Sequence, residues 1–162
     1  MSTSASLQIQ GVTPPPVVIA ALAPLMLKLA GTMADGTVTW MTGPATLASH
    51  TVPIITAAAE QAGRAAPQVL ASLPVCVTTD VDAARTRAAR DFQVYGFLPS
   101  YRAMLDREGA EGPADVAIVG DEGTVETQVR ALADAGVTEY VASIYGSREE
   151  RAQTRALLKS ML

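Results

Sequence analysis

The order of apolar segments along the chain is the feature that most restricts its fold. Four short runs rich in β-branched and small apolar residues alternate with longer segments in which apolar residues recur at helical spacing. The runs lie at residues 17–22, 37–41, 68–79 and 139–144. Strands that alternate with helices predict a parallel sheet with right-handed crossovers. We therefore expect an α/β fold built from four βα units.

The length limits how these units can be arranged. The chain has 162 residues, of which 49% are hydrophobic, and this suits one packed core. We expect an extended lead-in at residues 1–16, which ends in three prolines, and a single α/β domain at residues 17–162. Four units in line fit either a small open sheet or half of an eight-fold barrel, because a full barrel takes about 250 residues.

Residues with strong backbone preferences mark breaks and helix ends. Pro53 is expected to kink or split the Ala-rich second helix, and Pro74 to mark a bend, a bulge or an end in the third strand. Asp80 is an expected N-cap, and Ser147 with Glu150 has the spacing of a capping box.

The helix after Asp80 is expected to run to about residue 95. Its apolar stripe predicts that Arg85, Arg87 and Arg90 stay off the buried face.

Charge and hydropathy remove several classes of partner. The net charge is −4, and no window carries a Lys/Arg cluster free of acids, so we expect no nucleic-acid partner. The longest apolar stretch, residues 17–27, contains Pro24, whereas a membrane span takes about 20 apolar residues. The N-terminus has neither the basic start nor the apolar run of a signal peptide, so we expect a cytoplasmic protein without a membrane partner.

The chain has one cysteine, Cys76, and one histidine, His50. A single cysteine excludes an intramolecular disulfide, and a single histidine excludes a multi-histidine metal site. Cys76 falls within the third strand and is expected to be buried and inert. We expect no metal site.

The loops after the strands are the expected positions for ligands, because parallel α/β proteins bind them beyond the carboxyl ends of the strands. The first such loop, Ala21, Leu22 and Ala23, joins a buried strand to a helix N-terminus through small residues. Its amides and the helix dipole suit an anionic group such as a phosphate. A plain βα connection is the alternative, since the loop lacks the glycine fingerprint of nucleotide sites.

The second such loop holds Trp40, Met41, Thr42 and Gly43. A tryptophan at a strand end can stack on a planar ring, and Gly43 would let a ligand approach the backbone. Barrel packing followed by a helix cap explains the same residues equally well.

Three further residues are candidates for a substrate pocket. His50 has no cysteine, serine or carboxylate at a catalytic spacing, so it is read as a structural or pocket-lining residue. Tyr95 and Tyr101 belong to a cluster of aromatic residues at 92–101, although aromatics make up only 4% of the chain. Such a cluster indicates a lid or a pocket wall, and helix packing accounts for it as well.

Three stretches together resemble a known family. Residues 18–40, VIAALAPLMLKLAGTMADGTVTW, are similar to the middle of luciferase-like flavin or deazaflavin oxidoreductases. Residues 117–141, AIVGDEGTVETQVRALADAGVTEYV, resemble the segment before the last barrel strand of that family. Between them, YGFLPSYRAMLDREG at 95–109 is similar to the branch that uses coenzyme F420.

The resemblance implies the C-terminal half of a (β/α)8 TIM barrel, strands five to eight. It implies hydride transfer between coenzyme F420, or alternatively FMN, and a small organic substrate. In the family, the loop matching Ala21, Leu22 and Ala23 holds the phosphate end of the cofactor through backbone amides, and the loop matching residues 40–43 borders the same site. The family usually has Gly where this chain has Ala23, and no catalytic residue carries over.

Half a barrel also allows a different reading. A four-stranded parallel sheet has two unpaired edge strands, which proteins normally cover or pair. The chain is therefore expected to form a homodimer or to pair with a complementary N-terminal half-barrel, and a non-catalytic assembly or interaction module is the alternative function. A truncated gene or a misplaced start is a third interpretation.

Overall fold

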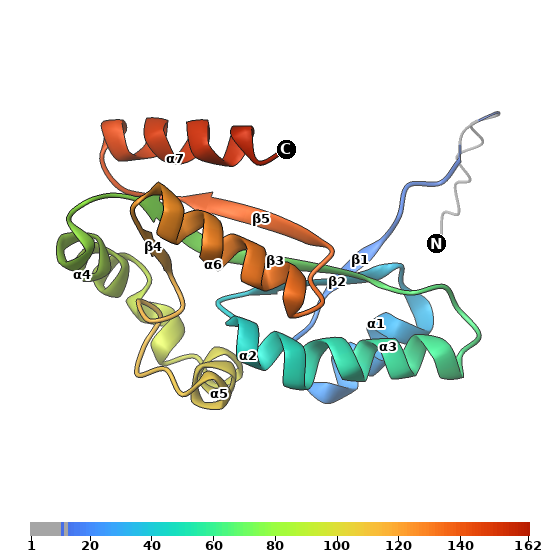
Figure 1. Cartoon of the computed structure of the whole chain (residues 1–162). Coiled ribbons are helices and arrows are strands. Elements are labelled where there is room, and N and C mark those ends of the chain that lie inside the picture. The colour runs from blue at the N-terminus through green and yellow to red at the C-terminus, as the bar shows by residue number, and fades with distance from the viewer. Residues whose placement is uncertain (1–10, 12) are drawn as a thin grey trace, which may run out of the picture.

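The computed structural model describes residue 11 and residues 13–162 (Figure 1). Its sheet holds four main parallel strands in the order β1 (Val18–Ala20), β2 (Gly36–Trp40), β3 (Gln68–Val77) and β5 (Glu139–Ile144). A short fifth strand, β4 (Ile118–Gly120), pairs with the end of β3. The predicted four βα units are confirmed. The predicted lead-in, residues 1–16, lies mostly outside the described residues.

Helices make every crossover between the strands. Most of these segments were expected from the sequence, with ends that differ by a few residues. They are α1 (Pro24–Met33), α2 (Pro44–Thr46), the π-helical turn η1 (Leu47–Thr51), α3 (Val52–Gln61), α4 (Val81–Asp91), the 3-10 turn η2 (Gln93–Gly96), α5 (Pro99–Glu108), α6 (Glu122–Asp134) and α7 (Arg148–Ser160).

Strand β3 is the centre of the sheet, because it pairs with three other strands. The Met41 amide donates to the Ser72 carbonyl at 3.3 Å, and the Thr78 amide donates to the Gly120 carbonyl at 2.8 Å. The backbone N–H and C=O groups of even-numbered β3 residues thus point toward β2 in the first part of the strand and toward β4 at its end. The other edge of β3 pairs with β5. Pro74 falls in the gap between β2 and β4, so its missing N–H breaks no ladder bond and β3 continues through it.

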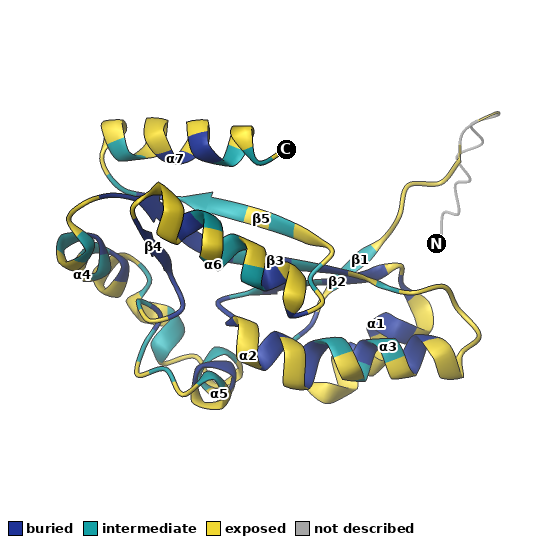
Figure 2. Ribbon diagram, viewed as in Figure 1, coloured by how far each residue is buried: buried dark blue, intermediate teal, exposed yellow. Residues whose placement is uncertain are grey.

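The main core lies on one face of β3. Val69, Ala71, Leu73, Val75 and Val77 are all buried, since their side chains alternate onto the face that packs against α1, α3, α6 and α7. On the opposite face, Leu70 and Ser72 are only partly buried (Figure 2). Near the end of β3 a smaller cluster covers this second face, where Cys76 packs against Ala84 and Ala88 of α4.

Two helices can be compared with the sequence expectation in detail. The Ala-rich second helix is interrupted as predicted, and the interruption is the π-helical turn η1, which ends at Thr51, two residues before Pro53. Helix α4 ends at Asp91 rather than near Tyr95, because Phe92 leaves the helix to pack in an aromatic cluster and the chain continues as the turn η2.

The outer edges of the sheet are open within the described part of the chain. β1 pairs only with β2, and β5 pairs only with β3. The sheet therefore curves without closing into a barrel (Figure 1).

Candidate cofactor site

A cavity of about 540 Å³ lies at the carboxyl ends of β1 and β2. Such a volume is in the range of small-molecule sites. Its walls come from the end of β1 and the loop after it, from β2, from one residue of β3, and from the start of α5. The lining residues are Ala20, Ala21, Leu22, Ala23, Met26, Val38, Thr39, Trp40, Ser72, Ser100 and Tyr101.

The N-terminus of α1 opens into this cavity. Ala23 is the N-cap, with φ −77° and ψ 150°, and it gives no side-chain cap. Pro24 has no N–H, and the first intrahelical bond runs from the Leu27 amide to the Ala23 carbonyl at 3.0 Å. The amides of Leu25 and Met26 therefore have no acceptor among the described residues, and the positive end of the helix dipole lies beside them.

Trp40 forms the aromatic side of the cavity. Its ring centroid lies 5.8 Å from that of Phe92 and 5.7 Å from that of Tyr95, both in edge-to-face geometry. Tyr95 in turn packs 5.0 Å from Tyr101, which lines the cavity. The aromatic residues at 92–101 are therefore both a pocket wall, through Tyr101, and a packing cluster. The buried indole Nε1 of Trp40 has no hydrogen-bond partner within the described region.

The residue after Trp40 holds a strained backbone. Met41 has φ 54° and is fully buried, and among the described residues it is the one non-glycine residue with positive φ. Its neighbour Thr42 is also fully buried and donates through Oγ1 to the Trp40 carbonyl at 3.3 Å. These two residues follow the end of β2, and neither of them lines the cavity.

Gly43 is adjacent to a carboxylate of the protein itself. Glu108 of α5 accepts from the amides of Ala45 at 3.1 Å and Thr46 at 2.7 Å, so it occupies the N-terminus of α2. A Cβ at Gly43 would collide with this carboxyl group. The space expected for a ligand at Gly43 is thus filled by Glu108, which comes from a distant part of the sequence.

His50 lies beneath the first loop. The side chain is buried, and its Nε2 lies 2.9 Å from the Leu22 carbonyl oxygen, to which it donates. This bond ties the loop after β1 to the turn η1. His50 therefore positions the wall of the cavity without lining it.

The structure brings half of the predicted site residues to one cavity. Ala21, Leu22, Ala23, Trp40 and Tyr101 line it. The other predicted residues stand behind these walls: Met41, Thr42, Gly43, His50 and Tyr95. The sequence did not identify Met26, Val38, Ser72 or Ser100, and only the expected alternation of side chains along β2 and β3 could have indicated Val38 and Ser72.

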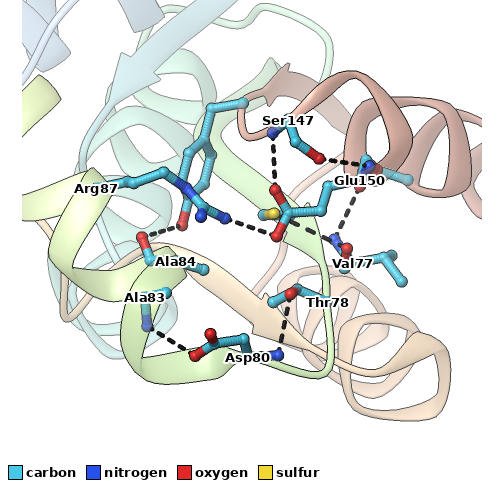
Figure 3. Close-up of polar contacts among 11 residues, drawn as sticks. Val77, Thr78, Asp80, Ala83, Ala84, Arg87, Ser147 and Glu150 are labelled. Carbon is cyan, nitrogen blue, oxygen red and sulfur yellow. Dashed lines mark hydrogen bonds and ion pairs between the residues drawn. The ribbon is translucent and has the colours of Figure 1, made fainter.

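A second set of carboxyl-end loops, after β3 and β5, carries charge (Figure 3). Arg87 of α4 pairs with Glu150 of α7 at 2.6 Å, and the side chains are 30% and 15% exposed. Glu150 also accepts from the Ser147 amide at 2.7 Å, and the Ser147 hydroxyl accepts from the Glu150 amide, which is the predicted capping box. The buried residues of α4 are Ala84 and Ala88, so Arg87 stays off the buried face as expected, although it is only partly exposed beside Glu150.

The neighbours of this ion pair complete a dense network. Tyr145 donates to the Ala84 carbonyl at 3.2 Å, and Cys76 is fully buried, as expected. Burial by itself raises the pKa of Glu150, but hydrogen bonds from Ser147, Thr78 and Arg87 outweigh it and lower this pKa to about 2. Burial, and then the Glu150 carboxylate, raise the pKa of the Cys76 thiol above its ordinary value.

Neither a metal cluster nor a spanning helix occurs in the part of the chain that the structure describes. No three His, Cys, Asp or Glu side chains there come together as metal ligands. No helix of that part is long and apolar enough to cross a membrane.

Comparison with protein-family models identifies the family of this chain. Residues 3–139 match the model of the luciferase-like monooxygenases, which is most of the chain. The chain belongs to the luciferase-like monooxygenase family. No curated protein sequence matches it significantly.

Solved structures of luciferase-like enzymes share its fold. An F420-dependent secondary alcohol dehydrogenase in complex with an F420-acetone adduct is 18% identical, with a TM-score of 0.71 over 93% of this chain and 50% of its own. The coenzyme F420-dependent tetrahydromethanopterin reductase from Methanopyrus kandleri is 25% identical, with a TM-score of 0.69 over 88% of this chain and 49% of its own. A monooxygenase from Streptomyces bottropensis is 18% identical, with a TM-score of 0.61 over 91% and 47%.

The chain thus spans about half the length of the solved structures that it matches. Those proteins are TIM-barrel enzymes, and the four βα units correspond to half of such a barrel, as the sequence predicted. The family consists of oxidoreductases and monooxygenases, so the chain is related to enzymes by descent.

Proposed function

We propose that this chain forms the phosphate-binding half of a deazaflavin site, in an oxidoreductase that transfers hydride between coenzyme F420 and a small organic substrate. The observation that carries the proposal is the neutral cavity at the carboxyl ends of β1 and β2, with unpaired amides at one end and aromatic side chains at the other. The F420-dependent neighbours support it.

The amide end of the cavity fits a phosphate. Leu25 and Met26 offer two N–H groups at the positive end of α1, and no side chain of the described residues competes for them. The Ala23 side chain has no acceptor atom, so it does not cap these amides. We expect the phosphate end of the cofactor to bind here.

The aromatic end of the cavity fits a planar ring. Val38, Trp40 and Tyr101 provide apolar surface, and their neighbours Phe92 and Tyr95 hold Trp40 in place. The Trp40 Nε1 is buried without a partner among the described residues, so a ring or ribityl oxygen would reach this donor only if the side chains around it moved. These side chains would orient the ring and exclude water from it, whereas the bound deazaflavin supplies the hydride chemistry.

The cavity lining holds no general acid or base other than Tyr101. A group that donates or accepts a proton during substrate turnover must therefore reach the cavity from its open side. We place the small-molecule substrate on that side, and we expect the protein to act in the cytoplasm.

Fluorescence titration of the purified chain with coenzyme F420, and separately with FMN, tests the proposal. We expect F420 to bind with a Kd of tens of micromolar or tighter. A deazaflavin riboside without phosphate is the matched ligand, and it should bind roughly tenfold more weakly, because it cannot use the α1 amides.

Two results would overturn the proposal. One is the absence of binding by both cofactors at about 100 μM. The other is equal affinity for F420 and its phosphate-free form, which would remove α1 from the site. Tighter binding of FMN than of F420 would keep the site and change the cofactor.

A non-catalytic half-barrel is the second candidate function. Among the described residues, Tyr101 is the single acid or base group in the cavity lining, and this scarcity favours it. An assay with F420, a secondary alcohol and the purified chain separates the two functions. Cofactor binding without any F420 reduction would support the non-catalytic module.

A further inference from the structure

Helix α5 supplies one wall of the candidate cofactor cavity. Its first turn carries Ser100 and Tyr101, which both line the cavity. Within the described residues, α5 packs mainly against α2 and η2 rather than against a strand of the sheet (Figure 1). The place of this wall therefore depends on the contacts that hold α5 to these two neighbours.

The C-terminal end of α5 is held by a carboxylate. Glu108, the last residue of the helix, accepts from the Ala45 amide at 3.1 Å and from the Thr46 amide at 2.7 Å. The Thr46 hydroxyl donates to the Met104 carbonyl of α5 at 3.3 Å. The N-cap of α2 is Gly43, which gives no side-chain cap, so Glu108 caps α2 from α5. These charge-assisted bonds join α5 to the loop after β2.

Gly43 leaves the space that this carboxylate occupies. Its backbone, with φ −77° and ψ 169°, is extended and open to any residue. A Cβ at this position would collide with the Glu108 side chain, to which its three nearest atoms all belong. The need for glycine here therefore comes from the packing of Glu108 and not from the backbone conformation.

The other end of α5 meets the aromatic side of the cavity. The Tyr101 ring centroid lies 5.0 Å from that of Tyr95, which lies 5.7 Å from that of Trp40. Trp40 is the last residue of β2, and the loop that Glu108 caps follows it directly. Both ends of α5 are thus fixed to the end of β2, through ring contacts beside the cavity and through hydrogen bonds at Glu108.

We propose that Glu108 is a positioning residue for the candidate cofactor site, because its carboxylate holds α5 where Ser100 and Tyr101 complete the cavity wall. The consequence for cofactor affinity rests on the proposed function. Without the carboxylate, α5 remains a helix but leaves this place in a large fraction of molecules. A ligand that needs the wall then binds only the remaining fraction, and its apparent affinity falls in proportion.

Two measurements on the chain without cofactor test the proposal. In Glu108→Ala, the amides of α5 should exchange with solvent roughly tenfold faster, because two hydrogen bonds to a charged group are lost. Trp40 is the only tryptophan of the chain, so its fluorescence reports on the cavity, and acrylamide should quench it more strongly in the variant. Asp106→Ala is the matched control, since it removes a carboxylate of the same helix that pairs with Arg102 of that helix. It should change neither measurement.

Gly43→Ala tests the same contact from the other side. The added Cβ should displace the Glu108 carboxyl group and reproduce the effects of Glu108→Ala. In the double variant Gly43→Ala/Glu108→Ala, the Cβ has room, so α5 should exchange no faster than in Glu108→Ala alone. Such non-additivity shows a direct contact, whereas two independent losses of stability would add.

Fluorescence titration extends the test to the cofactor. The affinity for coenzyme F420 should fall roughly tenfold in Glu108→Ala and in Gly43→Ala, and stay unchanged in Asp106→Ala. Four results would overturn the proposal: unchanged exchange of α5 in Glu108→Ala, equal effects of Glu108→Ala and Asp106→Ala, additive effects of the Gly43 and Glu108 substitutions, and equal F420 affinity of Glu108→Ala and the native chain. If F420 binds none of these proteins while exchange and quenching change as expected, the positioning role is supported and the proposed function is wrong.

Discussion

The loops after β1 and β2 and the loops after β3 and β5 lie at the same end of one sheet, yet they differ in almost every polar property. The first pair surrounds an open, neutral cavity beside the N-terminus of α1, whose Leu25 and Met26 amides have no acceptor among the described residues, and the buried Trp40 indole N–H also lacks a partner there. In the second pair, Arg87 and Glu150 form an ion pair that ties α4 to α7. A cavity of about 330 Å³ there is lined by acidic side chains that include Glu150, and the buried Arg87 Nε has no partner among the described residues.

This difference indicates that the loops after β1 and β2 are suited to ligand binding, whereas those after β3 and β5 contribute to stability. Polar groups that already have partners hold the fold together and have little left for a ligand. Polar groups without partners add nothing to stability and are available to a bound molecule. A ligand site is therefore expected where hydrogen-bond donors have no partner among the described residues. Substitutions in the first region should mainly change ligand affinity, and substitutions in the second should mainly change stability.

Removing the Glu150 carboxylate, at the loops after β3 and β5, should have the largest effect on stability. Glu150→Ala leaves Arg87 without its ion-pair partner and uncaps the start of α7, so we expect the free energy of unfolding to fall by roughly 3 kcal/mol. Urea unfolding measures this change. Glu149→Ala, at the exposed neighbouring position, should change it by less than about 0.5 kcal/mol. Similar losses for both variants would contradict a special role of Glu150.

Acid should weaken the same region. The folded protein lowers the pKa of Glu150 from an ordinary 4.5 to about 2, so its ionised form stabilises the fold above pH 4.5 and this contribution is lost as the pH falls toward 2. The full contribution is at most about 3 kcal/mol. The stability difference between the native chain and Glu150→Gln should therefore shrink between pH 5 and pH 2 in urea titrations. Parallel pH profiles of the two proteins would be inconsistent with this prediction.

A carboxylate introduced into the open region should separate stability from binding. Ala23→Asp places an acceptor at the N-cap of α1, so we expect the stability to rise by about 0.5 to 1 kcal/mol. The same carboxylate competes with a phosphate, and the affinity for F420 should fall at least about tenfold. Ala23→Ser is the control, because it caps without charge and should weaken binding less. Calorimetry and fluorescence titration measure the two effects, and a loss of both stability and binding would point to local misfolding.

The smallest changes in stability and affinity are expected when a single polar atom is removed from each region, the Tyr145 hydroxyl or the Trp40 Nε1. Tyr145→Phe removes a hydroxyl that donates to the Ala84 carbonyl, so it should cost about 1 kcal/mol of stability. Trp40→Phe removes an N–H without a partner among the described residues. Apart from the change in packing, it should therefore lower the stability by less than Tyr145→Phe does, while the F420 affinity falls roughly threefold. If Trp40→Phe is the more destabilising variant and leaves affinity unchanged, Trp40 is a packing residue only.

Local signals in the sequence predicted most of the fold. The capping box at Ser147 and Glu150, the stop before Pro53 and the strand at residues 139–144 are all decided by neighbouring residues. The end of α4 was placed too late, because the contact between Phe92 and Trp40 that ends the helix joins segments far apart in the sequence.

The site was less predictable for the same reason. From sequence alone, the small residues before Pro24 suit either an anion-binding loop or a plain βα connection, and it is the family resemblance that implies the phosphate. The filling of the space at Gly43 by Glu108, and the capture of Arg87 by Glu150, each depend on a contact across more than 60 residues, which no local pattern encodes.

The central position of β3 implies a hierarchy of local opening. β2, β4 and β5 each share a ladder with β3, so separating any of them disturbs the longest and most buried strand. β1 reaches the sheet only through the register of Val18–Ala20 with β2. Fraying should therefore begin at β1 and leave the remaining strands folded, so that the strand leading into the cavity wall is the part of the sheet that opens at the lowest free energy.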